Sequence, residues 1–92
     1  MENDYRFQRM KDILKIEMRY HNTGLANEFY KLYTEILYDS KYKFDHFELL
    51  NGRIREDLQT VKNFTDSEET FKREFYTTSR KAISSIEKHL VK

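Results

Sequence analysis

The chain has 92 residues, a formal net charge of +1 and no cysteine, proline or tryptophan. This length corresponds to a single domain, 1–92, and leaves no room for a separate catalytic module. Without cysteine the chain has no disulfide, no thiolate metal site and no cysteine nucleophile. Seventeen basic and sixteen acidic side chains nearly balance, which weakens the expectation of a strongly charged partner.

The breaks between elements must be read from Asn, Asp, Ser, Thr and the two glycines, because proline is absent. Clusters of these residues at 22–24, 39–40 and 63–67 divide the chain into four parts. We therefore predict an all-α fold, a small antiparallel helical bundle with four helices at about 4–20, 25–38, 43–64 and 66–91. If the first two helices are continuous, three long helices result instead.

The helix expected at 4–20 has Asn3 or Asp4 as its N-cap and Gly24 just beyond its last turn. It carries two apolar stripes, whereas a helix at the edge of a small bundle needs only one. The first stripe consists of Phe7, Met10, Leu14 and Met18, and the second of Tyr5, Ile13, Ile16 and Tyr20. The second stripe indicates either a wide aromatic core or a partner surface, so Ile13, Ile16 and Tyr20 are candidate protein-interface residues.

Arg6 and Glu17 lie between these stripes, and a basic row occupies the remaining face of the same helix. Lys11, Lys15 and Arg19 follow one another at steps of four residues, a spacing suited to contact with a phosphate backbone. An ordinary solvated helix face has the same composition, and Asp12 borders this one. Nucleic-acid contact through the row is therefore the weaker of two interpretations.

The helix expected at 25–38 has its apolar residues three and four apart, at Leu25, Phe29, Leu32 and Ile36. The segment that follows it alternates aromatic and basic residues. Such a segment suits recognition of a protein or of a single nucleic-acid strand, and it adds Tyr38 and Tyr42 to the candidate protein interface. The alternative is that Tyr42 and Phe44 only close the end of the bundle.

The helix expected at 43–64 contains Asn51 and Gly52, which would mark a hairpin turn in a strand. The apolar spacing keeps its phase on both sides, so we predict one helix that tolerates the glycine, with a break as the alternative. The helix expected at 66–91 begins at a capping box formed by Thr65 and Glu68. Basic residues in its last turn interact favourably with the helix dipole.

No motif for catalysis, metal binding or a cofactor is found. Glu17 and His21 share a helix face, but two ligands do not make a zinc site. The Thr77 to Ser79 and Ser84 to Ser85 hydroxyls fall inside a helix, where they normally bond back to the preceding turn. We therefore expect no enzyme activity, no cofactor and no metal.

The sequence favours a small cytoplasmic protein-protein interaction module of the inhibitor, immunity or adaptor type, with a homodimer as one option. The acidic first residues are unlike a signal peptide, and no apolar run approaches about 18 residues, so we expect no membrane insertion. The alternative function is a nucleic-acid-binding regulatory protein that uses the row of Lys11, Lys15 and Arg19.

Overall fold

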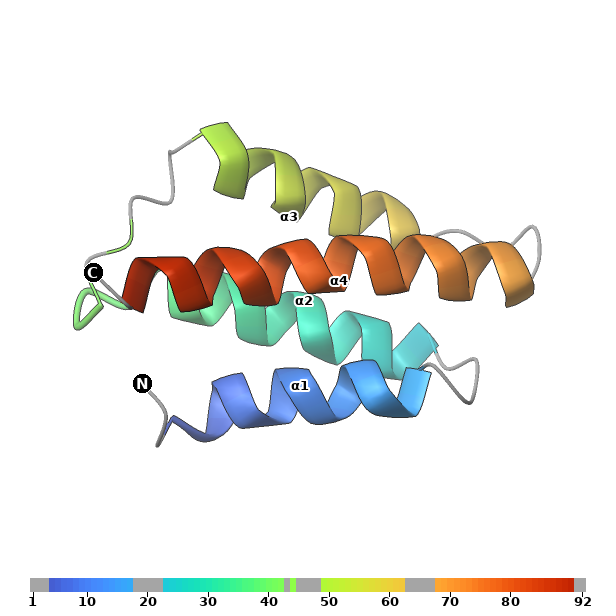
Figure 1. Cartoon of the computed structure of the whole chain (residues 1–92), viewed down its shortest axis with the longest axis horizontal. Coiled ribbons are helices and arrows are strands. Elements are labelled where there is room, and N and C mark those ends of the chain that lie inside the picture. The colour runs from blue at the N-terminus through green and yellow to red at the C-terminus, as the bar shows by residue number, and fades with distance from the viewer. Residues whose placement is uncertain (1–3, 18–22, 43, 45–48, 63–67, 91–92) are drawn as a thin grey trace.

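Four α-helices pack into an antiparallel bundle in the computed structural model (Figure 1). The structure describes residues 4–17, 23–42, 44, 49–62 and 68–90. The helices are α1 (Tyr5–Glu17), α2 (Thr23–Leu37), α3 (Leu49–Lys62) and α4 (Glu68–Leu90). Within the described ranges no residue forms a strand, and the prediction of an all-α bundle is confirmed.

Successive helices run in opposite directions, so both α1 and α3 start at the end of the bundle where α2 and α4 finish (Figure 1). Helix α1 packs on α2 and α4, and α3 packs on the same two helices. The 23 residues of α4 span about 35 Å, nearly the 37 Å length of the molecule. Because α1 and α2 are separate and antiparallel, the alternative of three long helices is wrong.

Helix α1 begins where the sequence predicts, with Asp4 as its N-cap. The Asp4 Oδ1 atom accepts a hydrogen bond of 2.9 Å from the main-chain amide of Arg6. The main-chain oxygen of Asp4 accepts bonds from the amides of Phe7 and Gln8. These contacts satisfy amides that a helix start otherwise leaves without partners.

Two helix starts differ from the predictions. Gly24 belongs to the first turn of α2, which begins at Thr23, so it does not separate the helices as expected. Phe44 is not helical, and α3 begins only at Leu49. The Phe44 ring is buried and stacks on His89 of α4, a tertiary contact that holds it away from a helical continuation. The predicted capping residue Thr65 lies outside the described residues.

Helix α3 passes through Gly52 without a break, as predicted. Apart from the glycine itself, its two chain neighbours and the backbone of the same helix, no atom of the described residues lies within 4 Å of the position that a Cβ atom would occupy there. The glycine is therefore not required for close packing.

Aromatic rings fill the centre of the bundle. The Phe29 and Phe75 rings meet edge to face with centroids 5.5 Å apart, and Phe71 stacks on Phe75 at 5.9 Å. Such contacts add to the free energy gained from burial. Helices α1 and α2 are also joined at the surface by a two-point ion pair between Arg9 and Glu28, at 2.7 and 3.0 Å.

Candidate functional site

A groove of about 540 Å³ lies between α3 and the C-terminal half of α4. In Figure 1, α3 lies against the first half of α4 and diverges from it toward the C-terminal end of α4. The buried side chain of Ile54 forms the α3 side, and the half-buried Tyr76 lies on α4. Thr77, Ser84 and Ser85 add hydroxyl groups to the α4 side.

Three cationic side chains complete the described part of the groove lining, and none of the described lining residues is acidic. They are Arg80, Lys81 and Lys88, all of which are exposed. Lys81 and Lys88 are seven residues apart, so they share one face of α4 and their backbones lie about 10.5 Å apart. The groove is therefore a concave positive surface.

Tyr76 positions Arg80 within this surface. The Arg80 Nη1 atom donates a hydrogen bond of 3.1 Å to the Tyr76 hydroxyl, and the Arg80 Cζ atom lies 5.4 Å from the Tyr76 ring centroid. A guanidinium group has five N–H donors, so this bond leaves donors that can bind a carboxylate. Holding the side chain in place reduces the entropy lost when a ligand binds.

Ser85 connects the groove to a buried polar cluster in the core. Its Oγ atom donates a hydrogen bond of 2.7 Å to the Asn51 Oδ1 atom, which also accepts one of 3.1 Å from the Tyr33 hydroxyl. Asn51 is 2% exposed and Tyr33 is fully buried. The cluster joins α2, α3 and α4, and it fixes the backbone of α4 beside the groove.

These groove and cluster residues were not predicted from the sequence as functional residues. For Asn51 a signal was present, because Asn51, Ile54, Leu58 and Val61 follow the three-and-four spacing of a buried stripe. For Arg80, Lys81 and Lys88 no local signal exists, because only the separation of α3 from α4 groups them into a concave surface.

A second, smaller depression of about 300 Å³ lies between α1 and α4. It shares Arg80 and Ser84 with the groove and adds Leu14, Ile83 and Glu87. Glu87 places a negative charge between the groove and α1. The positive surface of the groove is thus interrupted on the side that faces α1.

The candidate interface on α1 is not assembled as we expected. Ile13 is fully buried and belongs to the core, so the assignment of Ile13 to an exposed partner surface is wrong. The reason is that α1 packs on both α2 and α4, which covers more than one face of it. Ile16 is half-buried, and Tyr20 lies outside the described residues.

The two tyrosines after α2 have different environments. Tyr38 is 54% exposed, and the Arg55 guanidinium lies 5.4 Å from its ring centroid. Tyr42 is half-buried and packs against the core. Phe44 is buried beside it, so these two rings close the end of the bundle, as the alternative interpretation holds.

Only part of the basic row on α1 is exposed and so available to contact a ligand. Lys15 is exposed, but Lys11 is half-buried and its Nζ atom lies 4.4 Å from the Phe7 ring centroid. Arg19 lies outside the described residues. The bordering Asp12 accepts a hydrogen bond from Gln8 on the same helix.

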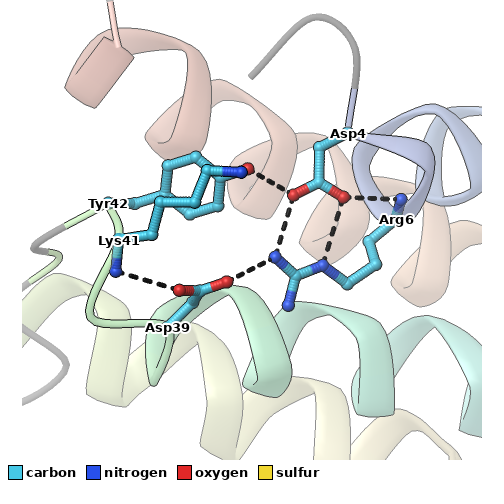
Figure 2. A network of polar contacts seen from close by, with 5 residues as sticks. All are labelled: Asp4, Arg6, Asp39, Lys41 and Tyr42. Carbon is cyan, nitrogen blue, oxygen red and sulfur yellow. Dashed lines mark hydrogen bonds and ion pairs between the residues drawn. The ribbon is translucent and has the colours of Figure 1, made fainter.

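Charged groups also form a polar network at the end of the bundle where α1 begins (Figure 2). Arg6 binds Asp4 at 2.8 Å and Asp39 at 2.7 Å, and the Tyr42 hydroxyl donates a hydrogen bond to Asp4. The backbone amide of Lys41 donates to Asp39 at 2.9 Å. The network therefore joins the start of α1 to the turn after α2.

The two carboxyl groups of this network are held in their ionised form. Hydrogen bonding to Arg6 is the main reason why the pKa of Asp4 lies well below its ordinary value, although partial burial acts in the opposite direction. The bond from Arg6 also lowers the pKa of Asp39. A general acid or base needs a pKa near the working pH, so these groups suit a structural role.

Among the described residues, no group of three or more His, Asp or Glu side chains is arranged to hold a metal ion. No helix in those parts of the chain is both long enough and apolar enough to cross a membrane. Comparison of the chain with protein-family models, curated proteins and solved structures finds no match.

Proposed function

We propose that this protein is a non-catalytic interaction module that binds an acidic segment of another protein in the groove between α3 and α4. The observation that carries the proposal is the lining of the groove, which brings Arg80, Lys81 and Lys88 together and includes no acidic residue among those the structure describes. A carboxylate-bearing segment complements this charge and can accept hydrogen bonds from the neighbouring hydroxyl groups.

The shape of the groove favours a protein segment over a small molecule. It is open along its length, whereas small-molecule sites enclose most of their ligand. The lining runs from Tyr76 to Lys88, which is about 18 Å along α4. A short stretch of polypeptide fills this length.

Charge distribution favours a protein over a nucleic acid. A phosphate backbone needs a continuous basic track, and most of its binding free energy comes from repeated phosphate contacts. Here Glu87 lies between the groove and α1, and Asp12 borders the row on α1. The basic groups of the two regions do not form one track.

The proposal is tested by binding of a fluorescent Glu/Ala copolymer peptide, with a Lys/Ala copolymer and single-stranded DNA as comparison ligands. The wild-type protein should bind the acidic peptide, and the double change Lys81→Glu with Lys88→Glu should weaken binding about tenfold or more. Each exposed ion pair contributes about 0.2–1 kcal/mol, and charge reversal adds repulsion of similar size, so two reversals reach the 1.4 kcal/mol that corresponds to tenfold.

The matched control is the double change Lys15→Glu with Lys31→Glu. Both lysines are exposed on α1 and α2, and the change in net charge is the same. This control should keep most of the affinity. Equal losses in the two variants would contradict a specific groove. Tighter binding of DNA, lost with Lys15→Glu, would favour the nucleic-acid alternative instead.

A further inference from the structure

We infer that the bound acidic segment carries a large aliphatic side chain close to the acidic residue that Arg80 binds, and that this side chain enters the depression between α1 and α4. The inference rests on the proposed function and adds a second recognition element to it. It is carried by the described residues that line both the groove and the depression, which are Arg80 and Ser84.

The depression has apolar walls on two sides. Leu14 lines it from α1 and Ile83 from α4, and both side chains are half-buried and pack against the core. Their remaining exposed surface is apolar area that a partner can remove from water, which favours binding. A cavity of about 150 Å³ holds a benzene molecule, so a depression of about 300 Å³ has room for a leucine side chain.

The charges that line the depression differ from those of the groove. Glu87 lines the depression together with Arg80, whereas none of the described lining residues of the groove is acidic. A carboxylate placed beside Leu14 would be repelled by Glu87, and a cation would be repelled by Arg80. The groove therefore selects the acidic part of the partner, and the depression selects an uncharged, apolar part.

Ser84 forms a low passage between the groove and the depression. It is exposed, and it lines both of them. A serine side chain has a single oxygen beyond its Cβ atom, so a partner can approach the helix closely at this point. A segment bound in the groove can therefore reach across α4 into the depression.

Tyr76 directs the Arg80 side chain away from this passage. It lies one turn before Arg80, and its hydroxyl accepts the 3.1 Å hydrogen bond from Arg80 Nη1. Ile83 and Ser84 lie one turn after Arg80, with their Cβ atoms about 5–6 Å from that of Arg80. A carboxylate bound to Arg80 and an aliphatic group packed on Ile83 can thus belong to neighbouring residues of one segment.

The test measures binding of short peptides with a central run of Glu residues in a Ser/Gly host, which behaves as a flexible chain. One series places a single Leu at successive positions beside the Glu run, and a matched series places Asn, which has a similar size and shape, at the same positions. The best Leu peptide should bind about tenfold more tightly than its Asn counterpart, which corresponds to about 1.4 kcal/mol for partial burial of the side chain. Its addition to the isotope-labelled full chain should shift the methyl NMR signals of Leu14 and Ile83.

Two glutamine variants separate the depression from the groove. Ser84→Gln places a longer, uncharged side chain in the passage. Thr77→Gln is the matched control, because Thr77 is also exposed on α4 and lines the groove but is not among the described residues that line the depression. Glutamine is a good helix former, so both variants should fold. Ser84→Gln should remove the advantage of Leu over Asn, and Thr77→Gln should keep it.

Equal affinities of the Leu and Asn peptides would overturn the aliphatic subsite and leave the proposed function intact. An advantage of Leu that persists in Ser84→Gln, with unchanged methyl signals of Leu14 and Ile83, would also overturn it, because the side chain would then bind elsewhere. Absence of binding by every Glu-containing peptide would overturn the proposed function itself.

Discussion

The Tyr33 hydroxyl donates a hydrogen bond of 3.1 Å to the side-chain oxygen of Asn51 in the interior of the bundle. The same oxygen accepts the bond from Ser85, so a single amide group satisfies hydroxyls from two other helices. A buried hydroxyl without a partner is costly. Asn51 thus determines the stability of the helix pair that borders the groove.

Replacement of Asn51 by leucine should destabilise the protein by about 1–3 kcal/mol, because it removes the buried acceptor that the Tyr33 and Ser85 hydroxyls share. Urea denaturation measures the free energy of unfolding. Adding Tyr33→Phe and Ser85→Ala should recover most of the loss, since the site is then uniformly apolar. An Asn51→Leu variant as stable as the wild type would show that the cluster contributes nothing.

Gly52→Ala should stabilise the protein by about 1 kcal/mol. Alanine loses less conformational entropy than glycine in a helix, and beyond its chain neighbours and the backbone of α3 no atom of the described residues lies within 4 Å of the new Cβ atom. For a domain of this size, the gain corresponds to a rise in melting temperature of about 4–8 °C, measurable by circular dichroism. A lower melting temperature would indicate that α3 bends at this residue in solution.

Ile13→Ala should cost about 2–5 kcal/mol, because the side chain is completely buried in the core. Ile16→Ala is the matched control on the same helix, and it should cost less since Ile16 is half-buried. Urea denaturation of both variants gives the comparison. If Ile13→Ala left the free energy of unfolding unchanged and altered only the oligomeric state, measured as molar mass in solution, an interface role for Ile13 would be restored.

Stability should fall in acid through the network of Asp4, Arg6 and Asp39. Hydrogen bonds from Arg6 lower the pKa of both carboxyl groups in the folded state. The unfolded chain therefore binds their protons first, so their stabilisation is complete above a pH of about 4 and is lost as the pH falls toward the folded-state pKa. Urea denaturation at several pH values should show the free energy of unfolding decreasing below that point.

Asp4→Asn should make this pH dependence shallower, because the variant keeps a capping side chain but has no titratable group at the position. Asp4→Ala also removes the cap and should cost about 1 kcal/mol more. An unchanged acid profile in Asp4→Asn would mean that other carboxyl groups govern the transition.

The helices were predictable because their apolar residues recur at three and four residues, as in Phe29, Leu32 and Ile36 of α2. The start of α3 was not predictable in this way. Phe44 is held outside the helix by stacking on His89, which is 45 residues away along the chain. Periodicity also could not show which apolar stripe of α1 is covered, because the burial of Ile13 depends on where α4 lies.

The groove depends even more on tertiary structure. Arg80, Lys81 and Lys88 resemble any solvated helix face in the sequence, and their common environment arises from the divergence of α3 and α4 (Figure 1). Local sequence patterns show which residues belong to a helix. A concave surface depends on how two helices are placed relative to each other, which local patterns do not show.

The contact between His89 and the turn after α2 has a consequence for the last turn of α4. The His89 ring stacks on Phe44 at 3.9 Å and donates a hydrogen bond of 3.0 Å to the main-chain oxygen of Tyr42. Final helical turns normally fray, and a frayed backbone must be ordered again when a ligand binds. Lys88 immediately precedes His89, so this cation is presented from an anchored backbone, and a partner would spend less of its binding free energy on ordering the end of the helix.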